Sequence, residues 1–289
     1  MTLGILFAFL ALLSWGIGDF FVQRAARAFG DLRTLFYIGA TGAVVLFPFV
    51  TDEFFSLAGN PLHFLLLTLT GVVIFAAAML DFEALRRGKI AVIEPILGLE
   101  LPVVIALTAI FWGEHLSLPQ GLLAGTTFVG IVLAVTKHHT HLHYHTRIFE
   151  RGVVFALAGS ILMGLVNFLV GASAQETSPL LTIWFTNTLF TALCLIFIAV
   201  RSELPGLLTG IIRHPSIFIA VSIFDNAAWL FYALATSLIA ISIATTISES
   251  YIALAVLLGL FVNREKLKYH QFVGVGVAIL SIILLAATL

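Results

Sequence analysis

Ten apolar runs, separated by short polar segments, follow one another along the whole chain. Each run is long enough to span the ~30 Å of a bilayer's hydrocarbon core as a helix. Cutting at charges, prolines and Gly/Asn breaks places the runs at residues 3–22, 33–50, 62–85, 90–112, 118–136, 152–172, 179–200, 216–236, 239–262 and 270–288. The pattern predicts ten transmembrane helices with short connections, apart from a longer loop after the fifth.

The fourth run, residues 90–112, combines membrane length with acids and prolines. It has no Lys or Arg, yet it contains Glu94, Pro95, Glu100 and Pro102. An ionisable group at membrane depth costs ~3 kcal/mol or more, and each proline removes a backbone donor, so these residues must face protein or a water-filled cavity. We therefore expect a broken helix that lines a cavity. The alternative is a kinked structural helix whose acids are buried and protonated.

Composition indicates an integral membrane protein. Hydrophobic residues make up 61% of the chain and charged residues 10%, with a mean hydropathy of +1.12, whereas soluble domains carry ~25% charged residues. The net charge of -1 gives no information on nucleic-acid or acidic partners. The single cysteine, Cys194, excludes an internal disulfide. No basic residue precedes the first run at Leu3, so we expect helix 1 rather than a cleaved signal peptide.

The two halves of the chain can be laid over each other with a slowly drifting offset. At 148 residues, identical or similar pairs are Gly16 with Gly164, Asp19 with Asn167, Phe20 with Phe168 and Val22 with Val170, and at 151 Glu114 falls on Glu265. Because each half has an odd number of helices, the second must insert upside down, which is the inverted repeat of alternating-access transporters. We expect an all-α membrane protein with ten helices in a 5+5 inverted repeat: residues 1–136, a connecting loop at 137–151, and residues 152–289.

Several short motifs resemble the EamA-like branch of the drug/metabolite transporter superfamily. They are Trp15-Gly16 in helix 1, a mid-helix Leu101-Pro102, the turn WGEHL at 112–116 before a Gly-rich helix, and a similar turn, NREKL, at 263–267. The resemblance implies a ten-helix secondary transporter that uses no ATP, with a central cavity lined by helices 1, 3, 4, 6, 8 and 9. It implies no particular substrate, because the superfamily handles amino acids, amines, drugs, nucleotide sugars and Mg²⁺.

Positive charge is distributed asymmetrically over the loops. All fourteen Lys and Arg fall in odd-numbered loops: Arg24, Arg27, Arg33, Arg86, Arg87, Lys89, Lys137, Arg147, Arg151, Arg201, Arg213, Arg264, Lys266 and Lys268. The positive-inside rule then places the odd loops in the cytoplasm and both termini outside. Many members of the family that this chain resembles have the reverse arrangement, with basic termini inside. We follow the charges of this chain and expect a multi-pass protein of the plasma or inner membrane.

The charges within the predicted spans are all acidic. Glu100 and Glu249 lie nearest the bilayer centre, in the corresponding helices 4 and 9, and Asp19 is the third candidate. Desolvation favours the protonated form of such a group, which can then exchange a proton as the transporter changes conformation. Asp81 and Glu83 precede Arg86 and Arg87 within about a turn, which predicts a salt-bridge gate or, equally, ordinary charges at a helix end.

The motion of this transporter is expected to use flexible points in helices 4 and 9. Pro95, Pro102 and Gly98 in helix 4, or Gly259 in helix 9, are the predicted bending points.

Polar and aromatic side chains recur at helical spacing near these acids. The predicted substrate- or proton-binding residues, besides Glu94, Glu100, Glu249 and Asp19, are Trp15, Asn167, Asp225, Trp229, Tyr232, Ser242, Thr245 and Thr246. An acid beside Trp or Tyr suits an amine or a quaternary ammonium, through charge pairing and cation–π contact. Alternatively, about half of the aromatic residues are interface anchors or packing.

The connecting loop holds five histidines in eight residues: His138, His139, His141, His143 and His145. Such a cluster can hold Zn²⁺ or Ni²⁺ or respond to cytoplasmic pH. The alternative is a linker that happens to be rich in histidine, since the cluster contains no Cys or acid.

Together these patterns predict a proton-coupled secondary transporter of a small polar or cationic metabolite or drug. The first alternative is a divalent-cation transporter with oxygen ligands from Asp and Glu and a metal-sensing His loop. A membrane enzyme or receptor would need a catalytic constellation or an extramembrane domain, and the sequence shows neither. We expect no cofactor and no nucleic acid, with a small-molecule substrate, protons and the lipid bilayer as partners, and a monomer or homodimer.

Overall fold

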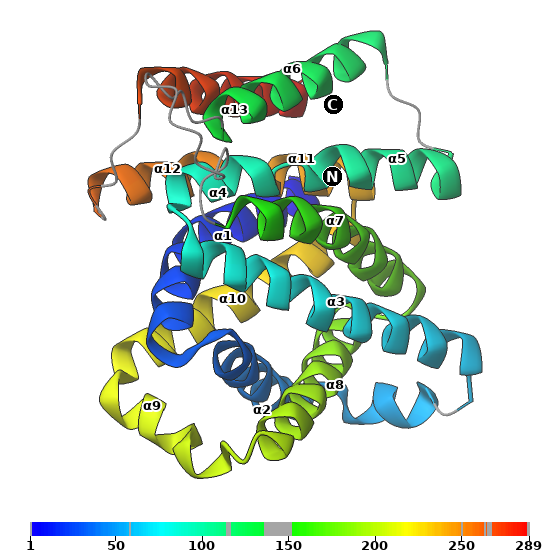
Figure 1. Cartoon of the computed structure of the whole chain (residues 1–289). Coiled ribbons are helices and arrows are strands. Elements are labelled where there is room, and N and C mark those ends of the chain that lie inside the picture. The colour runs from blue at the N-terminus through cyan, green and yellow to red at the C-terminus, as the bar shows by residue number, and fades with distance from the viewer. Residues whose placement is uncertain are drawn as a thin grey trace.

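The computed structural model describes residues 2–57, 59–113, 117–135, 152–249, 251–262, 264 and 268–287. Within these ranges the chain is helical and contains no strand (Figure 1). The helices are α1 (Thr2–Phe29), α2 (Asp31–Leu57), α3 (Pro61–Arg87), α4 (Ile90–Leu97), α5 (Glu100–Trp112), α6 (Leu118–Val135), α7 (Val153–Glu176), α8 (Pro179–Val200), α9 (Leu207–Arg213), α10 (Pro215–Thr236), α11 (Ile241–Glu249), α12 (Tyr251–Phe261) and α13 (Tyr269–Ala287), with a short 3-10 turn, η1 (Leu204–Gly206).

The fourth predicted helix is broken, as its prolines indicated. α4 ends at Leu97, and Gly98 and Leu99 form a turn before α5 begins at Glu100. Pro102 has no N–H to donate to the Gly98 carbonyl four residues back. That carbonyl instead accepts from the Leu101 N–H at 3.3 Å, the shorter spacing of a 3-10 turn. The break therefore follows from the position of Pro102, whereas Pro95 lies inside α4.

The ninth predicted helix corresponds to α11 and α12, which lie on either side of residue 250, a position outside the described ranges. α11 ends at Glu249 and α12 begins at Tyr251, whereas Gly259 lies inside α12. Bending near Gly259 stays a prediction. A lone glycine tolerates helical geometry at a cost of about 1 kcal/mol, so its presence does not by itself end a helix.

Two loop predictions also need correction. α1 continues through Arg24 and Arg27 to Phe29, so these arginines belong to the last turns of the helix, where cations complement the helix dipole. Only Gly30, with φ of +84°, separates α1 from α2. In addition, η1 and α9 occupy the connection between α8 and α10, which the sequence predicted to be a loop.

The packing pattern stays the same when each helix is replaced by its counterpart in the other half of the chain. α1 packs along α10 and α3 along α7, while α2 pairs with α8 and α6 with α13. Phe29 at the end of α1 contacts His214 just before α10, so these two helices are antiparallel. Arg33 near the start of α2 pairs with Glu203 after the end of α8, so the corresponding helices α2 and α8 also run in opposite directions. Figure 1 shows α6 and α13 beside each other, outside the layer formed by α4, α5, α11 and α12.

Among the described residues, seven helical stretches are long and apolar enough to cross a membrane, and α4–α5 forms one of them. In the most apolar part of α4–α5, 72% of the residues are buried, against 28–56% in the other six. The discontinuous helix therefore lies at the centre of the bundle. Large apolar side chains such as Phe49 and Phe55 cover the outside, which suits a lipid environment. The protein is a multi-pass membrane protein, and the count of ten spans stays a prediction.

Candidate functional site

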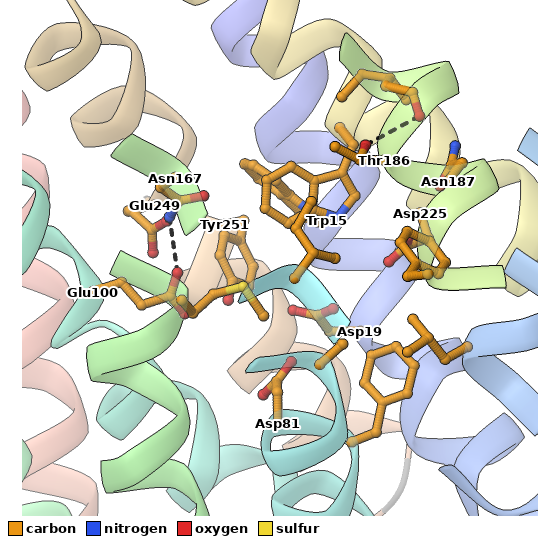
Figure 2. Close-up of a pocket in the computed structure, with 18 residues that line it drawn as sticks. Trp15, Asp19, Asp81, Glu100, Asn167, Thr186, Asn187, Asp225, Glu249 and Tyr251 are labelled. Carbon is orange, nitrogen blue, oxygen red and sulfur yellow. Dashed lines mark hydrogen bonds between the residues drawn. The ribbon is translucent and has the colours of Figure 1, made fainter. Parts of the chain in front are cut away.

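A cavity lies among the helices beside the break between α4 and α5 (Figure 2). It contains about 730 Å³ of atom-free space, which includes space open to solvent. Its polar lining comprises Asp19, Asp81, Glu100, Asn167, Thr186, Asn187, Asp225, Glu249 and Tyr251. All six helices that the resemblance implied contribute to the wall. Leu35 of α2 and several residues of α8 line it as well.

Glu100 and Glu249 meet at one side of the cavity, linked by Asn167 (Figure 2). The Asn167 Nδ2 atom donates to Glu100 Oε2 at 2.9 Å and to Glu249 Oε1 at 3.2 Å. Glu100 is the first residue of α5, directly after the break in that helix, and Glu249 lies in α11. Both side chains are almost fully buried. Two carboxyl groups that share one amide and no cation cannot both ionise easily.

Asn167 is held in place through its backbone carbonyl, on the side away from the cavity. The Tyr232 hydroxyl donates to the Asn167 carbonyl oxygen at 3.0 Å and lies 2.8 Å from the Thr245 hydroxyl. Tyr232 is fully buried and does not line the cavity. We infer that Tyr232 and Thr245 position Asn167, and through it the two glutamates.

A second group of acids comprises Asp19 of α1, Asp81 of α3 and Asp225 of α10. Asp19 lies close enough to both other aspartates for the charges to interact. The Asp81 Oδ1 atom is buried and has no hydrogen-bond partner in the part of the chain that the structure describes. Figure 2 shows this group on the opposite side of Tyr251 from Glu100 and Glu249.

Aromatic rings form the wall between the two acidic groups. The Trp15 ring lies 5.0 Å from that of Trp229, 5.4 Å from Tyr232 and 5.9 Å from Tyr251, measured between centroids. The edge-to-face packing of Trp15 and Trp229 is a favourable geometry for aromatic pairs. These rings give the cavity apolar surface between its acids.

Glu94 is separate from the cavity although it lies on a central helix. Its side chain is 0% exposed, and neither carboxyl oxygen has a hydrogen-bond partner among the described residues. The flanking α4 residues Ile93, Ile96 and Leu97 are fully buried and apolar. Tyr251 lines the cavity and lies near enough to interact with the carboxyl groups of both Glu94 and Asp19. Tyr251 thus lies close to both Glu94 and the acids of the cavity.

The described lining contains no Lys or Arg. Basic side chains gather instead where α1, α2, α3 and α8 end or begin. There Arg86 pairs with Asp31 at 3.2 Å, Arg86 and Arg87 both pair with Glu83, and Arg33 pairs with Glu203 at 3.0 Å. The predicted gate residues Glu83, Arg86 and Arg87 thus form one ion-pair network. Asp81, which the sequence grouped with them, lines the cavity instead.

Some predicted site residues lie away from the cavity. Ser242, Thr245 and Thr246 do not line it; the Thr246 hydroxyl donates to the Ser242 carbonyl at 2.6 Å and the Thr245 hydroxyl to the Ile241 carbonyl at 2.7 Å. Hydroxyls that bond back to their own helix need no ligand. The five loop histidines lie outside the described residues, and within the described ranges no three His, Cys, Asp or Glu side chains are arranged to hold a metal ion.

The sequence reading overlooked Tyr251 and Asn187. The offset of 151 that aligns Glu114 with Glu265 also aligns Glu100 with Tyr251, so the repeat contained a signal for this residue. Asn187 had no such signal. It donates to Asn226 Oδ1 at 2.8 Å, in the contact between α8 and α10, and only the packing of those helices brings it to the cavity wall.

Comparisons with known proteins agree with this architecture. A solved crystal structure, described only as that of a protein, matches with a TM-score of 0.69 and 14% identity, over 99% of this chain and 98% of its own, which supports the fold alone. The search of curated proteins finds no match. The model of the EamA-like transporter family matches residues 2–136 and again residues 150–287. The chain therefore belongs to the EamA-like transporter family, within the drug/metabolite transporter superfamily.

Proposed function

We propose that this protein is a proton-coupled secondary transporter of a small organic cation. The observation that carries the proposal is a single cavity with five carboxyl groups and no basic side chain in its described lining. Buried carboxylates are stable only when a cation or a proton neutralises them. A positively charged ligand and protons therefore neutralise the same carboxyl groups in turn, which is what the exchange of substrate for protons requires.

The Glu100–Asn167–Glu249 bridge is the proposed coupling element. Asn167 supplies only one N–H to each carboxyl group, and Glu249 Oε2 has no partner among the described residues. In the absence of a cation the pair retains at least one proton. When a cation arrives, the proton leaves and the ligand charge replaces it. The Glu100–Glu249 pair then binds either a proton or the cationic substrate, but not both at once.

The correspondence between the two halves supports alternating access. We propose a ten-span, 5+5 inverted repeat in which α4–α5 and α11–α12 are corresponding helices. The break between α4 and α5 lies beside Glu100 of the bridge, and the packing of α1 with α10 corresponds to that of α7 with α3. Transporters of this architecture expose a midplane site to each face in turn by moving one set of helices against the other.

The experiment that tests the function is a ligand screen followed by transport. The purified protein would be heated with organic amines, amino acids, nucleosides and divalent metals, and its melting temperature measured. We expect amines to raise the melting temperature and neutral or anionic compounds to leave it unchanged. In proteoliposomes, uptake of the best ligand should follow an imposed pH gradient and stop when a protonophore collapses it. Stabilisation by anions, or uptake indifferent to the gradient, would contradict the proposal.

Membrane orientation can be tested with two exposed positions on opposite ends of the bundle. In a Cys194→Ala background, cysteine at Ser117, between α5 and α6, should react with an impermeant thiol reagent in intact cells. Cysteine at Arg201, at the end of α8, should react only after the cells are opened, because the basic loops remain in the cytoplasm. The reverse labelling pattern would place both termini inside.

A further inference from the structure

The cavity contains unpaired hydrogen-bond acceptors at two separate places. On one side these are Glu249 Oε2 and Asn167 Oδ1, and on the other Asp81 Oδ1; none has a hydrogen-bond partner in the described chain. Glu249 is 1%, Asn167 1% and Asp81 7% exposed. A buried acceptor left unpaired costs ~1–3 kcal/mol. A ligand that satisfies both places must therefore carry donors at both of its ends.

The charges follow the same division. The charge of Asp225 acts on both Asp19 and Asp81. Glu100 and Glu249 form a separate pair, which Asn167 bridges. Figure 2 shows Glu100 and Glu249 on one side and Asp225 on the other, with Tyr251 and Trp15 between them. The aromatic surface between the acidic groups suits an apolar spacer better than a third charge.

We propose that the cavity binds a linear aliphatic cation with an amine at each end, a diamine or a longer polyamine. One ammonium group pairs with Glu100 and Glu249, the other with Asp81 and Asp225, and the methylene chain lies against Trp15 and Tyr251. An ammonium group offers three donors and no acceptor, which matches the set of unpaired acceptors. This inference rests on the proposed function, because it assumes that the carboxyl-lined cavity is the substrate site.

A monoamine and a bare metal ion fit this arrangement less well. A monoamine neutralises one acidic group and leaves the other without a counter-charge. Within the described ranges no three acidic or His side chains converge as metal ligands, so a divalent ion would lack the six or more oxygens that Ca²⁺ or Mg²⁺ prefers.

The test compares two matched series of ligands on the full-length protein. Dissociation constants would be measured by calorimetry for α,ω-diaminoalkanes of increasing length and for n-alkylamines with the same number of carbons. We expect one optimal diamine length, at which the diamine binds roughly tenfold or more tightly than the matched monoamine. Equal affinities for the two series at every length would overturn the inference and leave the cation transporter proposal standing. Binding by no amine at all would overturn both.

Variants locate the second ammonium site. Asp225→Asn should lower the ratio of diamine to monoamine affinity, whereas Glu176→Gln, an exposed change at the end of α7, should leave the ratio unchanged. If Asp225→Asn does not fold, Asp81→Asn serves the same purpose from α3. A ratio that is unaffected by a folded variant of either aspartate would overturn the assignment of the second amine to this group.

Discussion

Replacing Glu100 or Glu249 by Gln is expected to reduce pH-driven uptake to the level of protein-free liposomes while the protein still folds. Gln preserves the size and the contact with Asn167 but cannot release a proton. Each pH unit of gradient supplies about 1.4 kcal/mol per coupled proton, and without an exchangeable proton at the bridge this energy is no longer coupled to substrate movement. The measurement is uptake into proteoliposomes with an imposed pH gradient, for wild type and both variants.

The control for this experiment is Glu176→Gln. It makes the same chemical change at an exposed residue outside the cavity, and gradient-driven uptake should remain at the wild-type level. Melting temperatures of all three variants would establish that they fold. If both bridge variants retain full gradient-driven uptake, these two carboxyl groups are not the coupling groups, and Asp19 and Asp225 become the next candidates.

Replacing Glu94 by Met is expected to stabilise the protein and to abolish pH-driven uptake. The Glu94 carboxyl is fully buried without a hydrogen-bond partner in the described chain, so an apolar side chain of similar size removes a desolvation cost of ~1–3 kcal/mol. The presence of a residue that lowers stability in this way is explained if that residue performs a function. We infer that Glu94 stores a proton and exchanges it with Asp19 when the Tyr251 hydroxyl, which lies near both carboxyl groups, moves within hydrogen-bond distance of them.

Two measurements distinguish this role from a purely structural one. The melting temperature of Glu94→Met in detergent should rise, and ligand-induced stabilisation should persist because Glu94 does not line the cavity. Gradient-driven uptake should disappear. Leu97→Met, a buried and nearly volume-conserving change one turn along α4, should alter neither stability nor uptake appreciably. Normal gradient-driven uptake by Glu94→Met would show that the buried acid has no part in coupling.

The sequence by itself indicated the class of protein and its central helix. Long apolar runs have few alternatives to spanning a membrane, because the bilayer requires every backbone polar group to be satisfied within a helix. The break in α4–α5 could be predicted from Pro102 because proline removes a donor wherever it stands. Glu100, Glu249 and Asp19 could be singled out because a carboxyl group within an apolar run is costly unless it faces a cavity.

The tertiary structure decided which of the polar residues share the cavity. Helical spacing gives the face of one helix but not the neighbour that covers it, so Thr245 and Tyr232, predicted to line the site, instead lie behind Asn167 and hold it in place. Asn187 and Tyr251 enter the wall only because α8 and α12 pack against other helices there. The bridge between Glu100 and Glu249 joins side chains from two halves of the chain. Such a contact depends on how the halves dock, which no local pattern in either half determines.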